Sequence, residues 1–289
     1  MSLFTKKQPG VFLQDIKIQP QSIAGVITSI VALLGETETG PTMPTLVASF
    51  TDYKRLFGGY PGGDNYLPYA VEGFFLNGGQ RCYVCRVLAS DYAGTLAELE
   101  KVEEISIVYC PNAQAVPGLT ELLIKHCERL RYRFAILDSL KDKNPSSITN
   151  PKESAFGALC YSWIYVKQAG TGLYCLVPPG GHVVGIYART DLELGVNKAP
   201  TNAVVRGAVD IECTLSSNQQ DNLVLQGINC LRNFVGRGIR VWGSRTLSSQ
   251  PSKKYVNVCR LLIYLEQSIT KGTTWAVFLN PTMMPRGLK

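Results

Sequence analysis

Short apolar runs alternate along most of the chain with segments in which apolar positions recur every three or four residues. The runs, rich in Val, Ile and Leu, suit buried strands, whereas the second pattern is typical of amphipathic helices. We expect strands at residues 25–35, 44–50, 81–88, 105–110, 134–137, 158–166, 172–177 and 274–279. Helices are expected at residues 52–57, 67–77, 95–102, 119–131, 182–189 and 261–270. This alternation predicts a mixed α/β fold, with largely parallel or mixed sheets flanked by helices.

The first 20 residues differ in character from the rest of the chain. Pro9-Gly10 and Pro20 bracket a stretch whose later part alternates between apolar and polar residues, as an extended strand does. A lone terminal strand is either an edge strand of its own domain or a strand added to a neighbour's sheet. The pattern leaves both readings open. The residues expected to make the contact are Val11, Phe12, Leu13, Ile16 and Ile18.

A polar loop with two prolines, residues 141–156, is the clearest internal break. The predicted organisation is therefore an extended N-terminal arm at 1–20 and a first part of an α/β domain at 21–140. The loop comes next, and a second part of the α/β domain occupies residues 157–289.

Composition narrows the function classes. Of the 289 residues, 45% are hydrophobic and 18% are charged, which is enough apolar material for a sizeable core. The net charge of +7 is scattered along the chain, so we expect no nucleic-acid binding. A basic surface would equally suit an acidic neighbouring subunit. With no apolar run of membrane-spanning length and no signal peptide, we expect synthesis in the bacterial cytoplasm and no direct membrane insertion.

Few residues offer metal-binding chemistry. Cys82 and Cys85 have CxxC spacing, but they fall in an expected strand, where a separation of three places side chains on opposite faces. They therefore cannot share one metal ion. The chain has two histidines, His126 and His182. We expect neither a metal site nor a cofactor.

Catalytic patterns are equally weak. A Ser-His-Asp triad can be written from Ser162, His182 and Asp191, which keeps an α/β hydrolase as a less favoured alternative, although no Gly-x-Ser-x-Gly elbow is present. Gly236 and Gly238 precede a strand-like segment and match no phosphate-binding loop. We expect no enzymatic activity. Carboxylates near basic residues are expected to form structural ion pairs, within or between subunits. Examples are Asp191, Glu193 and Asp210, near Arg189, Lys198 and Arg206.

An ordered set of motifs resembles the phage tail-sheath family, in particular sheath proteins of extracellular contractile injection systems of the antifeeding-prophage type. Pro9-Gly-Val11 opens the set, and the stretches 67–71, 126–131 and 133–138 continue it. The most specific positions, expected to be structural, are Pro178, Pro179, Gly180, His182, Tyr187, Arg189, Asp191, Lys198, Gly236, Arg237, Gly238, Arg240, Trp242 and Arg245.

The resemblance implies assembly rather than catalysis. Sheath subunits of that family form a homo-oligomer of stacked six-fold rings around an inner tube, joined by extended terminal arms. Contraction drives the tube into a target membrane through a metastable lattice. The implied partners are the inner tube protein, other sheath paralogues, and baseplate and tail-terminator proteins. The implied setting is a phage tail-like particle released from the cell.

The resemblance also shows one departure. Family members usually continue beyond the expected strand at 274–279 with a Glu-Pro-Asn-Asp-like segment and a C-terminal assembly domain and arm, whereas this sequence ends at Lys289. A shifted reading frame near residues 279 and 280 would restore part of that continuation. The hypothesis is therefore a truncated sheath protein. The alternative is a short accessory paralogue without contractile competence.

Overall fold

A computed structural model describes residues 22–168 and 170–275. Eight strands form the main sheet, in the order β11-β10-β6-β5-β4-β1-β3-β2. Their bounds are β1 Val31–Gly35, β2 Thr45–Val47, β3 Cys82–Arg86, β4 Ile107–Tyr109, β5 Phe134–Asp138, β6 Gly157–Tyr161, β10 Ile228–Phe234 and β11 Gly238–Trp242. A second sheet, in the order β8-β7-β9, contains β7 Ile164–Lys167, β8 Tyr174–Val177 and β9 Ala208–Ile211.

The main sheet is parallel through its centre. Strands β3, β1, β4, β5, β6 and β10 pair in parallel, and the antiparallel strands β2 and β11 close its two edges. The predicted mixed α/β fold is confirmed. Because the parallel strands run in one direction, their carboxyl ends gather at one side of the sheet, where ligands and functional residues of such folds collect.

Helices cover both faces of the main sheet. One face packs on α1 (Phe50–Phe57), α2 (Leu67–Leu76) and α5 (Gly180–Leu194), and the other on α3 (Tyr92–Glu100), α4 (Leu119–Leu130) and α6 (Ser217–Leu225). Strand β1 shows the alternation behind this layering: Val31 and Leu33 belong to the first core, and Ala32 and Leu34 to the second. A strand buried on both faces reads as a continuous apolar run, which is why the sequence pattern located it.

Two expected strands differ from the structure. The strand expected at 25–35 begins only at Val31. The expected strand 158–166 is divided between β6 and β7, which belong to different sheets. Trp163 lies at the break, fully buried, and its indole nitrogen donates a hydrogen bond of 2.8 Å to the Ser139 carbonyl. The expected strand at 274–279 lies almost entirely outside the described residues.

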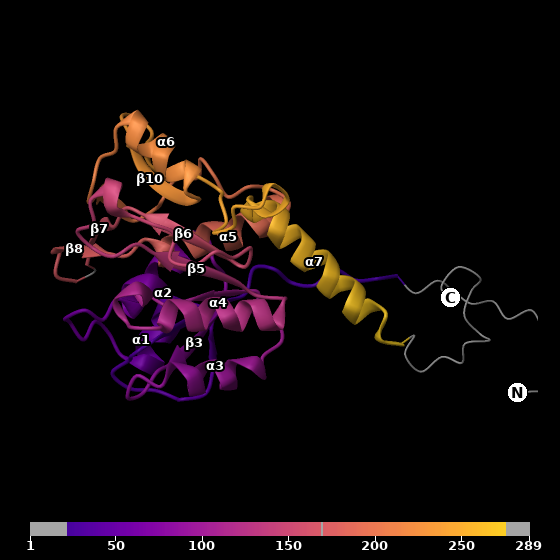
Figure 1. Cartoon of the computed structure of the whole chain (residues 1–289). Coiled ribbons are helices and arrows are strands. Elements are labelled where there is room, and N and C mark those ends of the chain that lie inside the picture. The colour runs from indigo at the N-terminus through magenta and orange to yellow at the C-terminus, as the bar shows by residue number, and fades with distance from the viewer. Residues whose placement is uncertain (1–21, 169, 276–289) are drawn as a thin grey trace, which may run out of the picture.

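Helix α7 (Val256–Gly272) extends away from the body of the protein, and the indigo segment that leads into β1 runs beside it (Figure 1). The Val26 amide donates to the Ser268 hydroxyl over 3.1 Å, and a Cβ placed on Gly272 would lie 2.6 Å from Ile23. Residues 22–28 are thus held against α7 instead of extending β1. Among the described residues, no helix combines the length and apolarity needed to cross a bilayer.

The loop at 141–156 joins β5 to β6, which are adjacent in the main sheet. The division of the chain at this loop stays a prediction.

Candidate functional site

Seven of the fourteen motif positions lie on α5 or directly before it, and this helix is buried from Gly180 to Ala188. Pro178 follows β8 and Pro179 is the N-cap of α5, so the two prolines end the strand and start the helix. His182, Tyr187 and Asp191 lie further along the helix. A helix buried on most sides marks the centre of the domain rather than a catalytic surface.

Glycines of the Pro-Pro-Gly-Gly-His motif allow α5 to approach α2 closely. A Cβ on Gly181 would lie 2.3 Å from the Ala70 Cα, and one on Gly185 would lie 2.4 Å from the Phe74 carbonyl oxygen. Real Cβ atoms do not come so near to backbone atoms. These glycines are therefore explained by backbone-to-backbone packing.

Asp138, the last residue of β5, accepts hydrogen bonds at the amino end of α5. Its carboxylate oxygens accept from the Gly180 amide at 2.8 Å, the Tyr109 hydroxyl at 2.7 Å and the Asn112 amide at 3.4 Å. Burial raises the pKa of Asp138 to about 7, although the three donors act in the opposite direction. Sequence reasoning placed Asp138 in a motif but assigned no role to it. Its position at the end of an apolar strand was the available signal.

The hypothetical triad is not assembled as a catalytic unit. The Ser162 hydroxyl donates to the Trp163 carbonyl and accepts from the Cys213 amide, both at 3.1 Å. His182 is buried against α2, where a Cβ on Gly73 would lie 2.4 Å from its ring, and burial lowers its pKa to about 4. Asp191 forms an ion pair with Arg260. Each member thus has a packing or ion-pairing partner of its own.

Asp191 forms a buried ion pair with Arg260 of α7. The Nη1–Oδ1 and Nη2–Oδ2 distances are 2.9 and 2.5 Å, and the side chains are 2% and 5% exposed. Arg260 also donates to the Thr28 carbonyl at 2.9 Å and lies 5.5 Å above the Tyr187 ring. Arg260 thus makes three hydrogen bonds, two of them to a carboxylate, and lies over an aromatic ring. The pair joins α5, α7 and the segment before β1.

Asp191 forms a structural ion pair, as expected, but its partner is Arg260 and not the nearby Arg189 or Lys198. Arg189 instead packs over Gly78, and burial together with Arg206 lowers its pKa. Lys198 is exposed, and its amide donates to the Gly195 carbonyl at 3.1 Å. Among the described residues, neither Glu193 nor Asp210 forms an ion pair.

The second group of motif positions forms the hairpin of β10 and β11. Gly236 and Gly238 have φ values of 72° and 73°, in the left-handed region that favours glycine. They turn the chain into β11, as expected. Phe234 and Trp242 pack with ring centroids 4.8 Å apart, and Arg237 lies 5.6 Å above the Phe234 ring.

Arg240 contacts the turn of this hairpin, and Arg245 contacts the segment that leads into α7. The Arg240 Nε donates to the Arg237 carbonyl at 3.1 Å, and the Arg245 guanidinium lies 5.6 Å above the Tyr255 ring. The side chain of Asn229 bonds both the amide and the carbonyl of Arg245, at 2.6 and 2.8 Å. These are positioning contacts.

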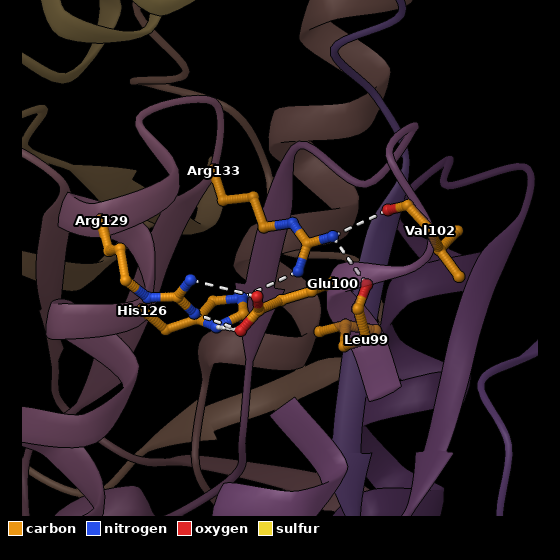
Figure 2. Close-up of polar contacts among 6 residues, drawn as sticks. All are labelled: Leu99, Glu100, Val102, His126, Arg129 and Arg133. Carbon is orange, nitrogen blue, oxygen red and sulfur yellow. Dashed lines mark hydrogen bonds and ion pairs between the residues drawn. The ribbon is translucent and has the colours of Figure 1, made fainter. Parts of the chain in front are cut away.

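A buried arginine stabilises the opposite face of the sheet. Arg133, fully buried, donates to the carbonyls of Leu99 at 2.8 Å and Val102 at 2.7 Å, which end α3 (Figure 2). Its other terminal nitrogen lies 2.8 Å from His126 Nε2. Because a guanidinium can only donate, His126 accepts with Nε2 and keeps its proton on Nδ1. Burial, followed by the charge of Arg133, lowers the pKa of His126 to about 4.

Glu100 completes this cluster at the surface. It lies 3.8 Å from His126 Nδ1, and Arg129 donates to it at 3.1 Å (Figure 2). The hydrogen bond from Arg129 lowers the pKa of Glu100. Sequence reasoning did not identify the cluster, because its members lie on three separate elements.

The expected arm residues Val11, Phe12, Leu13, Ile16 and Ile18 lie outside the described residues. Cys82 and Cys85 fall in different cores on opposite faces of β3, as expected. Within the described residues, no group of three or more His, Cys, Asp or Glu side chains could hold a metal ion.

The buried ion pair and the closely packed glycines hold α5 against α2 and α7. The family model for the central domain of the phage tail sheath protein matches residues 87–247, more than half of the chain. The chain belongs to the phage tail sheath family. The resemblance stated from the motifs is thereby confirmed.

Individual relatives agree with the family. A protein described as the major tail sheath protein of a prophage in Pseudomonas aeruginosa (strain UCBPP-PA14) is 24% identical over 179 residues, 59% of this chain and 46% of its own length. The tail sheath protein of Burkholderia phage BcepMu is 30% identical over 118 residues, 38% of this chain and 25% of its own. The matches thus span less than half of these curated relatives.

Solved structures extend the likeness to almost the whole chain. A subunit of the anti-feeding prophage helical sheath in its contracted state superposes with a TM-score of 0.77 at 27% identity, covering 96% of this chain and 79% of the other. A sheath complex of the extracellular contractile injection system PVC, also contracted, gives a TM-score of 0.77 at 22% identity, covering 96% of this chain and 77% of the other, which shows the fold. These tail sheath relatives are structural proteins.

Proposed function

We propose that this tail sheath protein is a structural subunit of a contractile sheath. It stacks as hexameric rings around an inner tube, and its contraction drives the tube through a target membrane. The observation that supports this most directly is the similarity to the anti-feeding prophage sheath, a helical assembly with a contracted state. The interior framework agrees, because its polar groups are used in packing and ion pairing.

The proposed partners derive from the same relatives. They are further copies of the chain, the inner tube protein, other sheath paralogues, and baseplate and tail-terminator proteins; one similar structure is an anti-feeding prophage baseplate. The proposed setting is a particle assembled in the bacterial cytoplasm and released. No enzymatic activity is proposed, because the relatives are structural sheath proteins.

Residues 1–20 are proposed to act as the arm that joins neighbouring subunits. The described chain begins beside the last turn of α7, where Ile23 lies against Gly272. An extended segment that starts there is well placed to reach a neighbour's sheet.

The test is co-expression of the full chain with the inner tube and baseplate proteins of its own system, followed by negative-stain microscopy. Striated tubes that shorten and widen on triggering are expected. A chain lacking residues 2–20 should keep its thermal unfolding transition and lose assembly. Particles that form but never contract would instead favour an accessory paralogue, and a soluble protein with hydrolase activity would contradict the proposal.

A further inference from the structure

A crevice of about 450 Å³ opens at the carboxyl ends of the parallel strands β1 and β4. From β1 the chain crosses to β3 on one side, and it returns to β4 on the other. Crevices at such a reversal of strand order are the usual binding places of doubly wound sheets. One residue of the sheath motifs, Leu67, lines this crevice, but none of its charged residues belongs to a motif, so the motifs do not explain its acidic lining.

The charged residues that line the crevice, Glu36 and Asp64, are both acidic. They share one wall, because the Asn65 side chain donates to the Glu36 carbonyl at 2.9 Å. Asp64 is held by the Tyr66 hydroxyl at 2.9 Å, and both carboxylates belong to exposed residues. Neither Glu36 nor Asp64 forms an ion pair with any of the residues that the structure describes.

The crevice also contains an acceptor without a donor. The side-chain oxygen of Asn112 is buried and receives no hydrogen bond among the described residues, while the Asn112 amide donates to Asp138. Two carboxylates and an unpaired amide oxygen form a set of acceptors. A guanidinium, which only donates, is the side chain that fits such a set best.

Arginines, whose charge is complementary to that of the acidic crevice, lie at the other end of the main sheet. The β10–β11 hairpin carries Arg232, Arg237 and Arg240, none of which pairs with a carboxylate in the described part of the chain. Arg237 lies at its tip beside Val235, whose side chain is fully exposed. Contacts with the Phe234 ring and the Asn202 side chain hold Arg237 in place without neutralising it.

The two surfaces lie far apart in one molecule. The hairpin closes one edge of the sheet, whereas β3 and β2 alone separate β1 from the opposite edge. In Figure 1, β10 and β3 lie at opposite ends of the body of the protein. Complementary patches at opposite ends of a subunit produce head-to-tail contacts, which close into rings or continue as helices. A two-fold dimer would instead need a self-complementary patch.

We propose that Arg237 of one copy enters the acidic crevice of the next copy, at Glu36, Asp64 and Asn112. This inference rests on the proposed function, which supplies the second copy of the chain. The contact is head-to-tail, electrostatic and separate from the N-terminal arm. It fixes the direction in which subunits follow one another.

The test uses two charge-reversed full-length proteins. One carries Arg237→Glu, so that residue 237 and the crevice it would enter are both acidic. The other carries Glu36→Lys with Asp64→Lys, so that Arg237 and the crevice are both basic. By sedimentation velocity, each alone should associate about tenfold more weakly than the wild type, because like charges then meet. Their equimolar mixture should recover association, and wild-type association should weaken as salt is raised.

Lys141→Glu, a reversal of an exposed lysine in the 141–156 loop, is the matched control and should associate as the wild type does. If the wild type associates and the variants match it, or if the mixture is no better than its components, this contact is overturned while the proposed function stands. A loss caused by the crevice variant alone would assign the crevice to another ligand and also overturn it. A wild type that stays monomeric with its system's partners present would refute the proposed function as well.

Discussion

Asp191 on α5 and Arg260 on α7 form a two-point ion pair inside the protein although they are 69 residues apart in the chain. Arg260 also binds the Thr28 carbonyl, so one guanidinium fastens both α7 and the segment that leads from the N-terminus. If residues 1–20 act as an arm, a force applied to that arm reaches the core of the subunit at this pair.

Removing one partner of this pair should be costly. Arg260→Met leaves the Asp191 carboxylate buried without compensation, and the free energy of unfolding should fall by about 3–5 kcal/mol. Urea unfolding at pH 7 measures it. The double variant Arg260→Met, Asp191→Leu should recover most of the loss, since a buried pair can often be replaced by apolar groups.

A matched control is the exposed pair of Arg55 and Asp52, 3.2 Å apart on α1. Arg55→Ala should cost less than about 1 kcal/mol, as surface pairs do. Equal losses for Arg55→Ala and Arg260→Met would contradict the structural role given to the buried pair.

Replacing a motif glycine by alanine should change the stability of the protein in the direction opposite to that expected from helix propensity. Within a helix, Gly→Ala ordinarily stabilises by about 1 kcal/mol. Gly181→Ala should nevertheless destabilise by about 1–3 kcal/mol, because the new Cβ meets the Ala70 backbone. Gly59→Ala, where no atom lies within 4 Å of the new Cβ, is the control, and it should be neutral or slightly stabilising. Thermal and urea unfolding of both variants compare them directly, and a stabilised Gly181→Ala protein would refute the close packing of α2 on α5.

Much of the layered fold could be predicted from the sequence, because strands buried on both faces leave continuous apolar runs and their covering helices leave a helical period. β1 and β4 were found in this way. The prediction failed where an apolar run had another use. Residues 25–28 lie along α7, where the Val26 amide donates to Ser268 and Gly25 lies against Tyr264. Residues 158–166 are divided between two sheets, with Trp163 between them.

The polar framework could be predicted only in part. The motif drew attention to Asp191, but its partner Arg260 lies on a distant helix, and local charge spacing suggested the wrong arginine and lysine. Asp138 accepts hydrogen bonds at the amino end of α5 only because Gly180 lies next to the carboxyl end of β5 in the folded protein. Such pairings arise from tertiary structure, which charge spacing along a single chain does not encode.

Asp138 should make stability fall as pH rises. Its native pKa is about 7, against 3.8 for the ordinary carboxyl, so between these values the native state binds more protons than the unfolded state. The stabilising contribution is complete below about pH 4 and is lost as pH rises through 7, by about 4 kcal/mol in the limit. The measurement is the unfolding free energy of the wild type minus that of Asp138→Asn across this range. A difference that does not change with pH would contradict the raised pKa.

His126 should act in the opposite direction. Its native pKa is about 4, against 6.5 in the unfolded chain, so the unfolded state binds more protons between these values. Its contribution to stability is therefore present above pH 6.5 and is lost as pH falls through 4, by about 3 kcal/mol in the limit. His126→Gln keeps an acceptor for Arg133 and does not titrate. Between pH 7 and pH 4, its free energy of unfolding should therefore fall by less than that of the wild type.

Comparing His126→Gln with His126→Ala separates the effect of the hydrogen bond to Arg133 from the effect of protonating His126. Neither variant titrates, but alanine leaves Arg133 without its acceptor on α4, so His126→Ala should be less stable than His126→Gln at every pH. Urea unfolding at pH 4, 5.5 and 7 measures all three proteins on one scale. Parallel pH profiles for the wild type and His126→Gln would show that His126 is not held neutral, and equal stability of the two variants would show that Arg133 does not depend on it.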